Sequence, residues 1–196
     1  TIAGLTINTG GVLNDGGRQL SVTGTSIILN GTIAGTGQLR TGNATTTIDG
    51  AGSMTGGNRL SFNVDPGAVT FPATANLTFG RIDAGQPTTV TNNGTVTVGL
   101  SGLTKGGGGG GTWTNAAGST LILNTGATAP AVDPAWTLIT NSGTLTLNGS
   151  GAILAITNGA TGTLNISATP TVPTITTLTV SAAGNTVNYN GAGAQA

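Results

Sequence analysis

The sequence predicts an all-β fold, a β-solenoid (parallel β-helix) of about nine or ten coils. Leu, Ile and Val alternate with Thr and Ser along short segments, which places the apolar side chains on one face of each strand. These segments recur about every 21 residues, with Gly and Asn at the breaks between them. No window has the apolar spacing of an amphipathic helix. A coil of two or three short strands with sharp corners needs about this length of chain.

The composition of the chain is compatible with a folded β-solenoid that forms a single domain. Only 5% of the 196 residues are charged and 36 are Gly, whereas about 25% charged residues are usual. Disordered chains also have many Gly residues, but they lack recurring aliphatic residues, so this chain is expected to fold. We predict a single solenoid domain over residues 1–196, with a Gly-rich loop insertion at 106–111.

The individual strands are indicated by a four-residue unit: apolar, any, apolar, then a small polar residue or Gly. The units begin at Leu5, Leu20, Ile27, Leu60, Leu77, Val96, Leu121, Leu145, Leu154, Leu164 and Leu178. From Leu60 the main series advances by 17, 19, 25, 24 and 19 residues, which we interpret as one coil per step. Leu20 and Leu154 fall outside this series and are expected in additional strands of a coil.

The corners between strands repeat a phrase that appears as TNNG, TNAAG, TNSG and TNGATG. Asn and Gly tolerate the left-handed backbone that a tight corner demands. Stacked Thr and Asn side chains can form ladders, whereas stacked like charges repel, so low charge follows from stacking. A right-handed coil is expected for parallel strands. An antiparallel β-sandwich is the alternative, disfavoured by the scarcity of aromatic residues and the long repeat.

Two segments carry a resemblance. TNSGTLTLNGSG and TNAAGSTLIL resemble the repeats of secreted bacterial β-solenoids, such as autotransporter passengers and filamentous-haemagglutinin-like adhesins. The segment SAAGNTVNYNGAGAQ, residues 181–195, is similar to an element of long extracellular repeat proteins of bacteria. These resemblances imply an extracellular or cell-surface location and a structural or adhesive role, and they transfer no catalytic residue.

The residues needed for most catalytic chemistry are missing. The chain has no Cys, His or Glu, and no two of its five Asp residues are closer than 16 positions. A polysaccharide lyase or hydrolase on a solenoid would need paired carboxylates or a base beside bound calcium. We therefore expect no enzyme activity, no cofactor and no metal site. Because the net charge is zero, we expect no binding to nucleic acid. Because long apolar runs are absent, we expect no insertion into a membrane.

Four arginines recur near the coil period, 22, 19 and 22 residues apart: Arg18, Arg40, Arg59 and Arg81. If they share a corner, they form a cationic ladder for an anionic ligand. The alternative, which we favour, is that each pairs with a nearby Asp. The expected pairs are Arg18 with Asp15, Arg81 with Asp83, and Arg59 with Asp65 or Asp49.

The aromatic residues allow two expectations. Phe62 and Phe79 stand at the same place in LSFN and LTFG, which predicts a stacked internal pair. Trp113 and Trp136 form either an exposed sugar-binding platform or an aromatic lid over a coil end or corner.

Neither end of the sequence resembles a solenoid cap, because strand residues begin in TIAGLTI and NTVNYNGAG continues nearly to the last residue. Unpaired strand edges recruit other chains. We therefore expect a secreted structural protein that assembles head-to-tail with itself into an extracellular filament. The alternative is a stalk or passenger segment of a surface adhesin that binds glycan or another cell.

Overall fold

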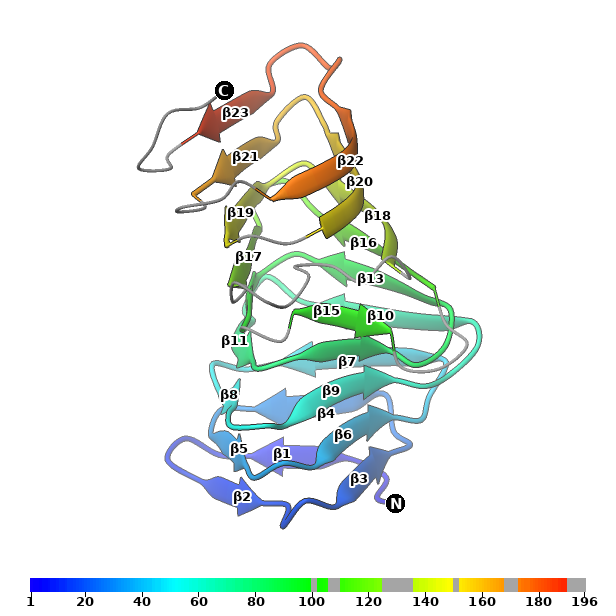
Figure 1. The fold of residues 1–196 in the computed structure, drawn as a ribbon. Coiled ribbons are helices and arrows are strands. Elements are labelled where there is room, and N and C mark those ends of the chain that lie inside the picture. Colours follow the sequence, from blue (N-terminus) through cyan, green and yellow to red (C-terminus); the bar gives the residue numbers. More distant parts are fainter. Residues whose placement is uncertain (100–101, 106–109, 125–135, 150–151, 168–172, 190–196) are drawn as a thin grey trace.

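The computed structural model confirms the predicted fold class: the chain is a parallel β-solenoid, and the described residues contain strands and turns but no helix (Figure 1). The structure describes residues 1–99, 102–105, 110–124, 136–149, 152–167 and 173–189. Residues 106–109 of the expected Gly-rich insertion lie outside these ranges. Gly111, the last residue of that insertion, is the first residue of a strand.

The strands form three parallel sheets. Sheet 1 consists of β1 (Leu5–Ile7), β4 (Ser26–Leu29), β7 (Thr45–Asp49), β10 (Gly67–Phe71), β13 (Thr88–Asn92), β16 (Gly111–Asn115), β18 (Trp136–Asn141), β20 (Ala152–Asn158) and β22 (Thr174–Thr179). Sheet 2 consists of β2 (Val12–Asn14), β5 (Thr32–Ala34), β8 (Ser53–Met54), β11 (Asn76–Phe79), β14 (Thr95–Val98), β17 (Thr120–Asn124), β19 (Thr144–Asn148), β21 (Thr163–Ile166) and β23 (Thr186–Tyr189). Sheet 3 consists of β3 (Gln19–Val22), β6 (Gln38–Thr41), β9 (Arg59–Phe62), β12 (Ile82–Ala84) and β15 (Leu103–Lys105).

The number of turns is slightly lower than predicted. The described strands amount to about seven complete turns, against the nine or ten coils expected. The reason is that sheets 1 and 2 have nine strands each, whereas sheet 3 has five. From β16 onward each coil therefore has two described strands rather than three.

The strand pairing shows which sequence units share a column. Leu77, Val96, Leu121, Leu145 and Leu164 are in register in sheet 2, as the repeat predicted.

Of three other units, Leu20 was assigned correctly, Leu154 only in part and Leu60 wrongly. Leu60 belongs to β9 of sheet 3, so the step of 17 residues to Leu77 passes through β10 and two corners and is not a full coil. Leu20 is in β3, an additional strand of the first coil, as expected. Leu154 is in β20, an additional strand as expected, but it is 36% exposed, because Ile153 and Ile156 are the buried apolar residues of this strand.

A continuous apolar core fills the solenoid, and its largest side chains are aromatic. The expected Phe62–Phe79 pair is wrong, because β9 and β11 belong to different sheets. Phe79 packs instead on Phe71, with ring centroids 5.9 Å apart, and Phe62 packs edge-on against Trp136 at 6.3 Å. The aromatic side chains thus link the three sheets across the core.

Candidate functional site

The repeated corner phrase forms a buried asparagine ladder. The side-chain amide of Asn92 donates to Asn115 Oδ1 at 2.8 Å, Asn115 to Asn141 at 2.8 Å, and Asn141 to Asn158 at 2.7 Å. The second amide hydrogen of each side chain is donated to a backbone carbonyl of the neighbouring coil. The ladder therefore satisfies buried polar groups and fixes the stacking of four coils.

The predicted stacking of Asn is confirmed, but the backbone reason given for Asn is wrong. Among the described residues, no residue other than Gly has a positive φ. Asn is required for its amide, whose NH₂ group donates two hydrogen bonds while its oxygen accepts at least one. Gly is required at Gly94 and Gly143 because a Cβ there would lie 2.4 Å and 2.3 Å from carbonyl oxygens of the preceding coil.

The two ends of the described solenoid share an unusual feature. Seven apolar residues pack against the core but remain only partly buried. They are Ile2, Leu5, Leu13, Leu20, Ile175, Leu178 and Val187. All seven belong to the first and last coils, where no described coil covers their outer side.

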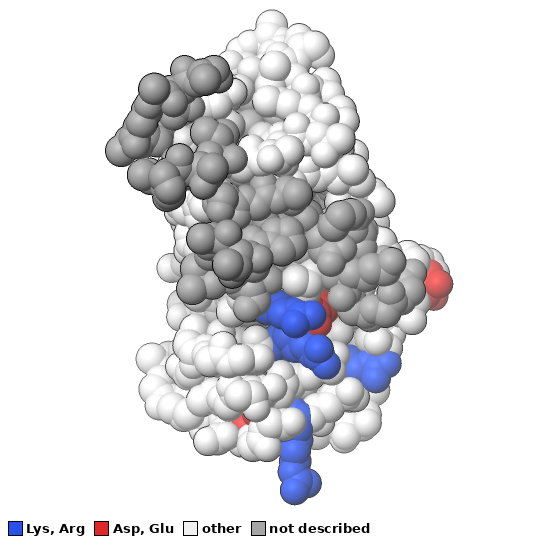
Figure 2. Space-filling model, viewed as in Figure 1, with Lys and Arg blue, Asp and Glu red and all other residues white. Residues whose placement is uncertain are grey.

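The basic residues of the chain all lie on one sheet. Arg40 and Arg59 belong to β6 and β9, Arg18 and Arg81 directly precede β3 and β12, and Lys105 ends β15. Figure 2 shows the Lys and Arg residues gathered on one face, over the strands of sheet 3. The four arginines that recur near the coil period thus lie in or next to one sheet.

They do not form a single column. The register Gln19–Gln38–Arg59 continues to Arg81, whose carbonyl accepts a hydrogen bond from Leu60 N. Arg40 pairs with Ser61 and belongs to the next outward column. Arg59 and Arg81 are therefore direct neighbours, while Arg40 is offset along the strand direction.

The ion pairs differ partly from those expected. Arg81 Nε lies 2.5 Å from Asp83 Oδ1, as predicted, whereas Arg59 Nε lies 3.6 Å from Asp83 Oδ2, so Arg59 pairs with neither Asp65 nor Asp49. The Asp83 side chain is 1% exposed and also accepts a hydrogen bond from Thr104 Oγ1. One buried carboxylate thus serves two partly exposed guanidinium groups.

Arg18 has no ion pair in the part of the chain that the structure describes. The expected partner, Asp15, instead accepts hydrogen bonds from the backbone N–H groups of Gly17 at 2.8 Å and Gly37 at 3.1 Å. The carboxylate therefore joins two coils at a corner, and the exposed Arg18 guanidinium is available to solvent.

A polar groove of about 190 Å³ lies on sheet 3 between Arg18 and Arg59. It is lined by Gly17, Arg18, Gln19, Thr36, Gly37, Gln38 and Arg59. Arg59 Nη2 donates to Gln38 Oε1 at 3.2 Å, which orients the guanidinium along the column. Sequence reasoning found both arginines but missed the glutamines, because Gln38 becomes their neighbour only through strand register.

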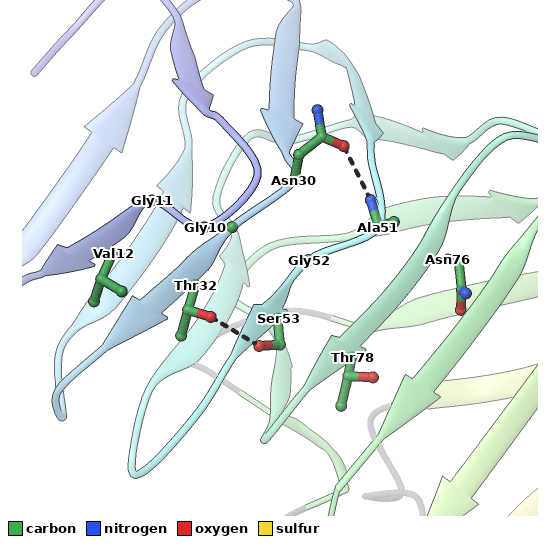
Figure 3. Close-up of a pocket in the computed structure, with 11 residues that line it drawn as sticks. Gly10, Gly11, Val12, Asn30, Thr32, Ala51, Gly52, Ser53, Asn76 and Thr78 are labelled. Carbon is green, nitrogen blue, oxygen red and sulfur yellow. Dashed lines mark hydrogen bonds between the residues drawn. The ribbon is translucent and has the colours of Figure 1, made fainter.

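A larger groove of about 350 Å³ lies along sheet 2 (Figure 3). Glycines 11, 31 and 52 form its floor, because a Cβ on Gly31 or Gly52 would lie 2.2 Å from the carbonyl oxygen of the glycine one coil below. Its other lining residues include Val12, Ala51 and hydroxyl and amide side chains, among which the Thr32 and Ser53 hydroxyl oxygens lie 3.5 Å apart. Among the described residues that line this groove, none has an ionisable side chain.

Both tryptophans are buried, which excludes the exposed sugar-binding platform, one of the two alternatives that the sequence allowed. Trp113 and Trp136 are at most 1% exposed, and their ring centroids lie 5.9 Å apart. Trp136 Nε1 donates to the carbonyl of Thr104 at 3.0 Å. The ring of Trp136 lies over Gly111, where a Cβ would approach its Cε3 to 2.6 Å. The pair is an internal packing element.

Two further features that bear on function are groups of metal-ligating side chains and helices that could cross a membrane. Within the described ranges, no three Asp, Glu, His or Cys residues are grouped as metal ligands would be. The described part of the chain also contains no helix of the length and apolarity needed to cross a membrane.

The fold and its surfaces define the chain as a parallel β-solenoid protein. No protein-family model, curated protein or solved structure matches the sequence or the fold significantly.

Proposed function

We propose that this chain is a structural subunit of an extracellular bacterial filament, in which subunits stack head-to-tail by pairing the strands at their ends. The observation that carries the proposal is the set of seven partly buried apolar residues, which occurs only in the first and last coils of the described solenoid. Core positions of the interior coils are almost completely buried. A further coil on either end would bury the exposed part of these residues.

The end strands fit such an arrangement. In the described structure β1 and β22 are the outer strands of sheet 1, and β2 and β23 are the outer strands of sheet 2. Pairing β22 with β1 and β23 with β2 of the next subunit continues both sheets. Unpaired backbone groups then gain partners, and apolar area is removed from water at about 25 cal/mol per Å². Because the two surfaces differ, the contact is head-to-tail and generates an open filament.

The extracellular location is supported by composition and by the resemblance of TNSGTLTLNGSG and TNAAGSTLIL to secreted bacterial solenoids. The absence of Cys is compatible with many secreted bacterial proteins. Enzyme activity is not part of the proposal, since neither groove combines two carboxylates or contains a His or Cys.

A second candidate function is the stalk of a surface adhesin. The open ends also favour this role, because coils of a longer chain would stack on β1 and β22 in the same way. The two functions differ in whether this chain assembles with itself.

Electron microscopy of the purified chain at neutral pH tests the proposal. Nine strands in each long sheet, spaced about 4.8 Å, predict an axial step of roughly 43 Å per subunit. Val187→Asp places a charge in the last coil and should abolish filaments while far-UV circular dichroism stays unchanged.

The matched control is Thr89→Asp, which adds the same charge at an exposed position on the side of sheet 1 and should leave filaments intact. Discrete short rods of the unaltered chain at all concentrations would contradict filament assembly and favour the stalk.

A further inference from the structure

We propose that the face of sheet 3 binds an acidic polysaccharide chain that runs along the solenoid axis, with its anionic groups held by Arg18 and Arg59 in the groove between them. This inference concerns the side of the solenoid and does not rest on assembly through its ends.

The distribution of charge is the first argument. The whole chain has five Lys and Arg residues, and all five lie in or next to sheet 3. Of the five Asp residues, Asp83 belongs to a strand of this sheet, and Asp15 lies at its corner. A chain with zero net charge therefore presents one clearly positive face (Figure 2). Such a face attracts polyanions from solution.

The groups in the groove are the second argument. Arg18, Gln19, Gln38 and Arg59 provide hydrogen-bond donors to one groove of about 190 Å³. Guanidinium groups match the geometry of carboxylate and sulfate oxygens and bind them with two parallel hydrogen bonds. The Arg59 side chain is 43% exposed, and its contact with Asp83 is 3.6 Å, so the guanidinium keeps donors that face solvent.

Asp83 does not neutralise the face. Its carboxylate is buried beneath two arginines, and its shorter contact is with Arg81. One negative charge is thus shared between two guanidinium groups, while Arg18 and Arg40 have no ion pair among the described residues. The buried carboxylate orients the arginines and leaves an excess of positive charge outside.

The spacing of the cations favours a polysaccharide over a nucleic acid. Neighbouring coils are separated by about 4.8 Å, and each coil of sheet 3 has one Lys or Arg. A polyuronate or singly sulfated glycan carries one charge per sugar ring, and a ring is similar in length to this step. Duplex DNA has one charge per about 1.7 Å of its axis. The two cations of the groove, Arg18 and Arg59, lie two coils apart at β3 and β9, so their separation of about two sugar rings matches the sparser polymer.

Binding of polygalacturonate, dextran sulfate and neutral dextran to the full-length chain, measured by isothermal titration calorimetry, tests the proposal. We expect binding of one or both acidic polymers that weakens as the salt concentration rises, and no binding of neutral dextran. Preference for polygalacturonate or for dextran sulfate identifies carboxylate or sulfate as the preferred group. The double variant Arg18→Gln/Arg59→Gln should lose at least about tenfold in affinity, because it removes both guanidinium groups that hold the anionic groups of the polymer.

Two controls protect this result. Arg18→Gln alone removes a side chain without an ion pair in the described structure, so it tests binding even if the double variant folds poorly. Thr89→Asp lowers the net charge by the same amount as Arg18→Gln, but on sheet 1, and should leave the affinity unchanged. Equal affinity of Arg18→Gln, the double variant and the unaltered chain would overturn the proposal. So would a lack of binding to both acidic polymers, or tighter binding of duplex DNA than of either.

Discussion

The side-chain amide of Asn115 donates a hydrogen bond to Oδ1 of Asn141 at 2.8 Å, and both side chains are completely buried. These residues lie 26 positions apart in the sequence and are paired across β16 and β18. Each also donates to a backbone carbonyl of the next coil, Thr144 for Asn115 and Thr163 for Asn141. The ladder therefore connects the coils at the same corner where the chain passes from sheet 1 to sheet 2.

We predict that Asn141→Ala lowers the free energy of unfolding by about 3 kcal/mol. The substitution leaves the amide of Asn115 and Oδ1 of Asn158 without their partners, and a buried unsatisfied polar group costs about 1–3 kcal/mol. Urea unfolding followed by circular dichroism measures the loss.

Asn148→Ala is the matched control. Its amide donates to Asn124 Oδ1 at 2.8 Å, but this ladder bond is exposed, so water can replace the lost partner. We expect a change within about 0.5 kcal/mol. Equal losses for the two variants would show that burial of the ladder is not what makes it stabilising.

The alternation of apolar and polar residues was sufficient to predict the strands and their parallel stacking. The period of two is a local property, and every coil must present the same pattern to its neighbours. Assignment of units to sheets was less successful. Leu60 and Leu77 carry the same motif but lie in sheets 3 and 2, because consecutive strands of one coil also alternate in this way. Motif similarity therefore identifies inward residues but not the sheet to which they belong.

From the sequence, a cationic ladder was only the less favoured alternative to pairing of each arginine with a nearby Asp. Spacing near the coil period placed Arg18, Arg40, Arg59 and Arg81 on one sheet. Their columns were not predictable, because a shift of one or two residues in the start of a strand moves a side chain to another position. Arg59 is the first residue of β9, whereas Arg40 is the third residue of β6. The same register brings Asp83 to Arg59 from one coil away, beyond what proximity in sequence suggests.

Replacing the shared carboxylate tests its structural role. We predict that Asp83→Asn lowers the free energy of unfolding by about 2 kcal/mol, because two guanidinium groups lose their buried anion. The loss stays below that of a fully buried pair, since both arginines remain accessible to water. Thermal unfolding at neutral pH provides the measurement.

Asp65→Asn, an equal change of charge at an exposed residue, should alter stability by less than about 0.5 kcal/mol. If Asp83→Asn proved as stable as Asp65→Asn, the two ion pairs would contribute nothing to folding. Because Asp83→Asn also removes a negative charge from sheet 3, the face becomes more positive, and binding of an acidic polysaccharide should become stronger rather than weaker.

The explanation that the chain has few charges because stacked like charges repel can be tested on the outward-facing threonine column of sheet 1. Paired strands place one Thr above the next over seven coils: Thr47, Thr70, Thr91, Thr114, Thr140, Thr157 and Thr179. Thr91 and Thr114 are direct neighbours in this column, on β13 and β16. Like charges at such positions repel, because adjacent strands are only about 4.8 Å apart.

We predict that Thr91→Lys and Thr114→Lys each change stability by less than about 0.5 kcal/mol, since a single charge on this face stays in water. The free energy of unfolding of the double Lys variant should be lower by about 0.5–1 kcal/mol than the sum of the two single effects predicts. Thr91→Lys combined with Thr114→Glu should show coupling of the opposite sign. Urea unfolding of the complete double-mutant cycle at low salt measures both terms, and high salt should reduce them. Additive behaviour of the two Lys substitutions would mean that repulsion between stacked coils does not explain why the chain has so few charges.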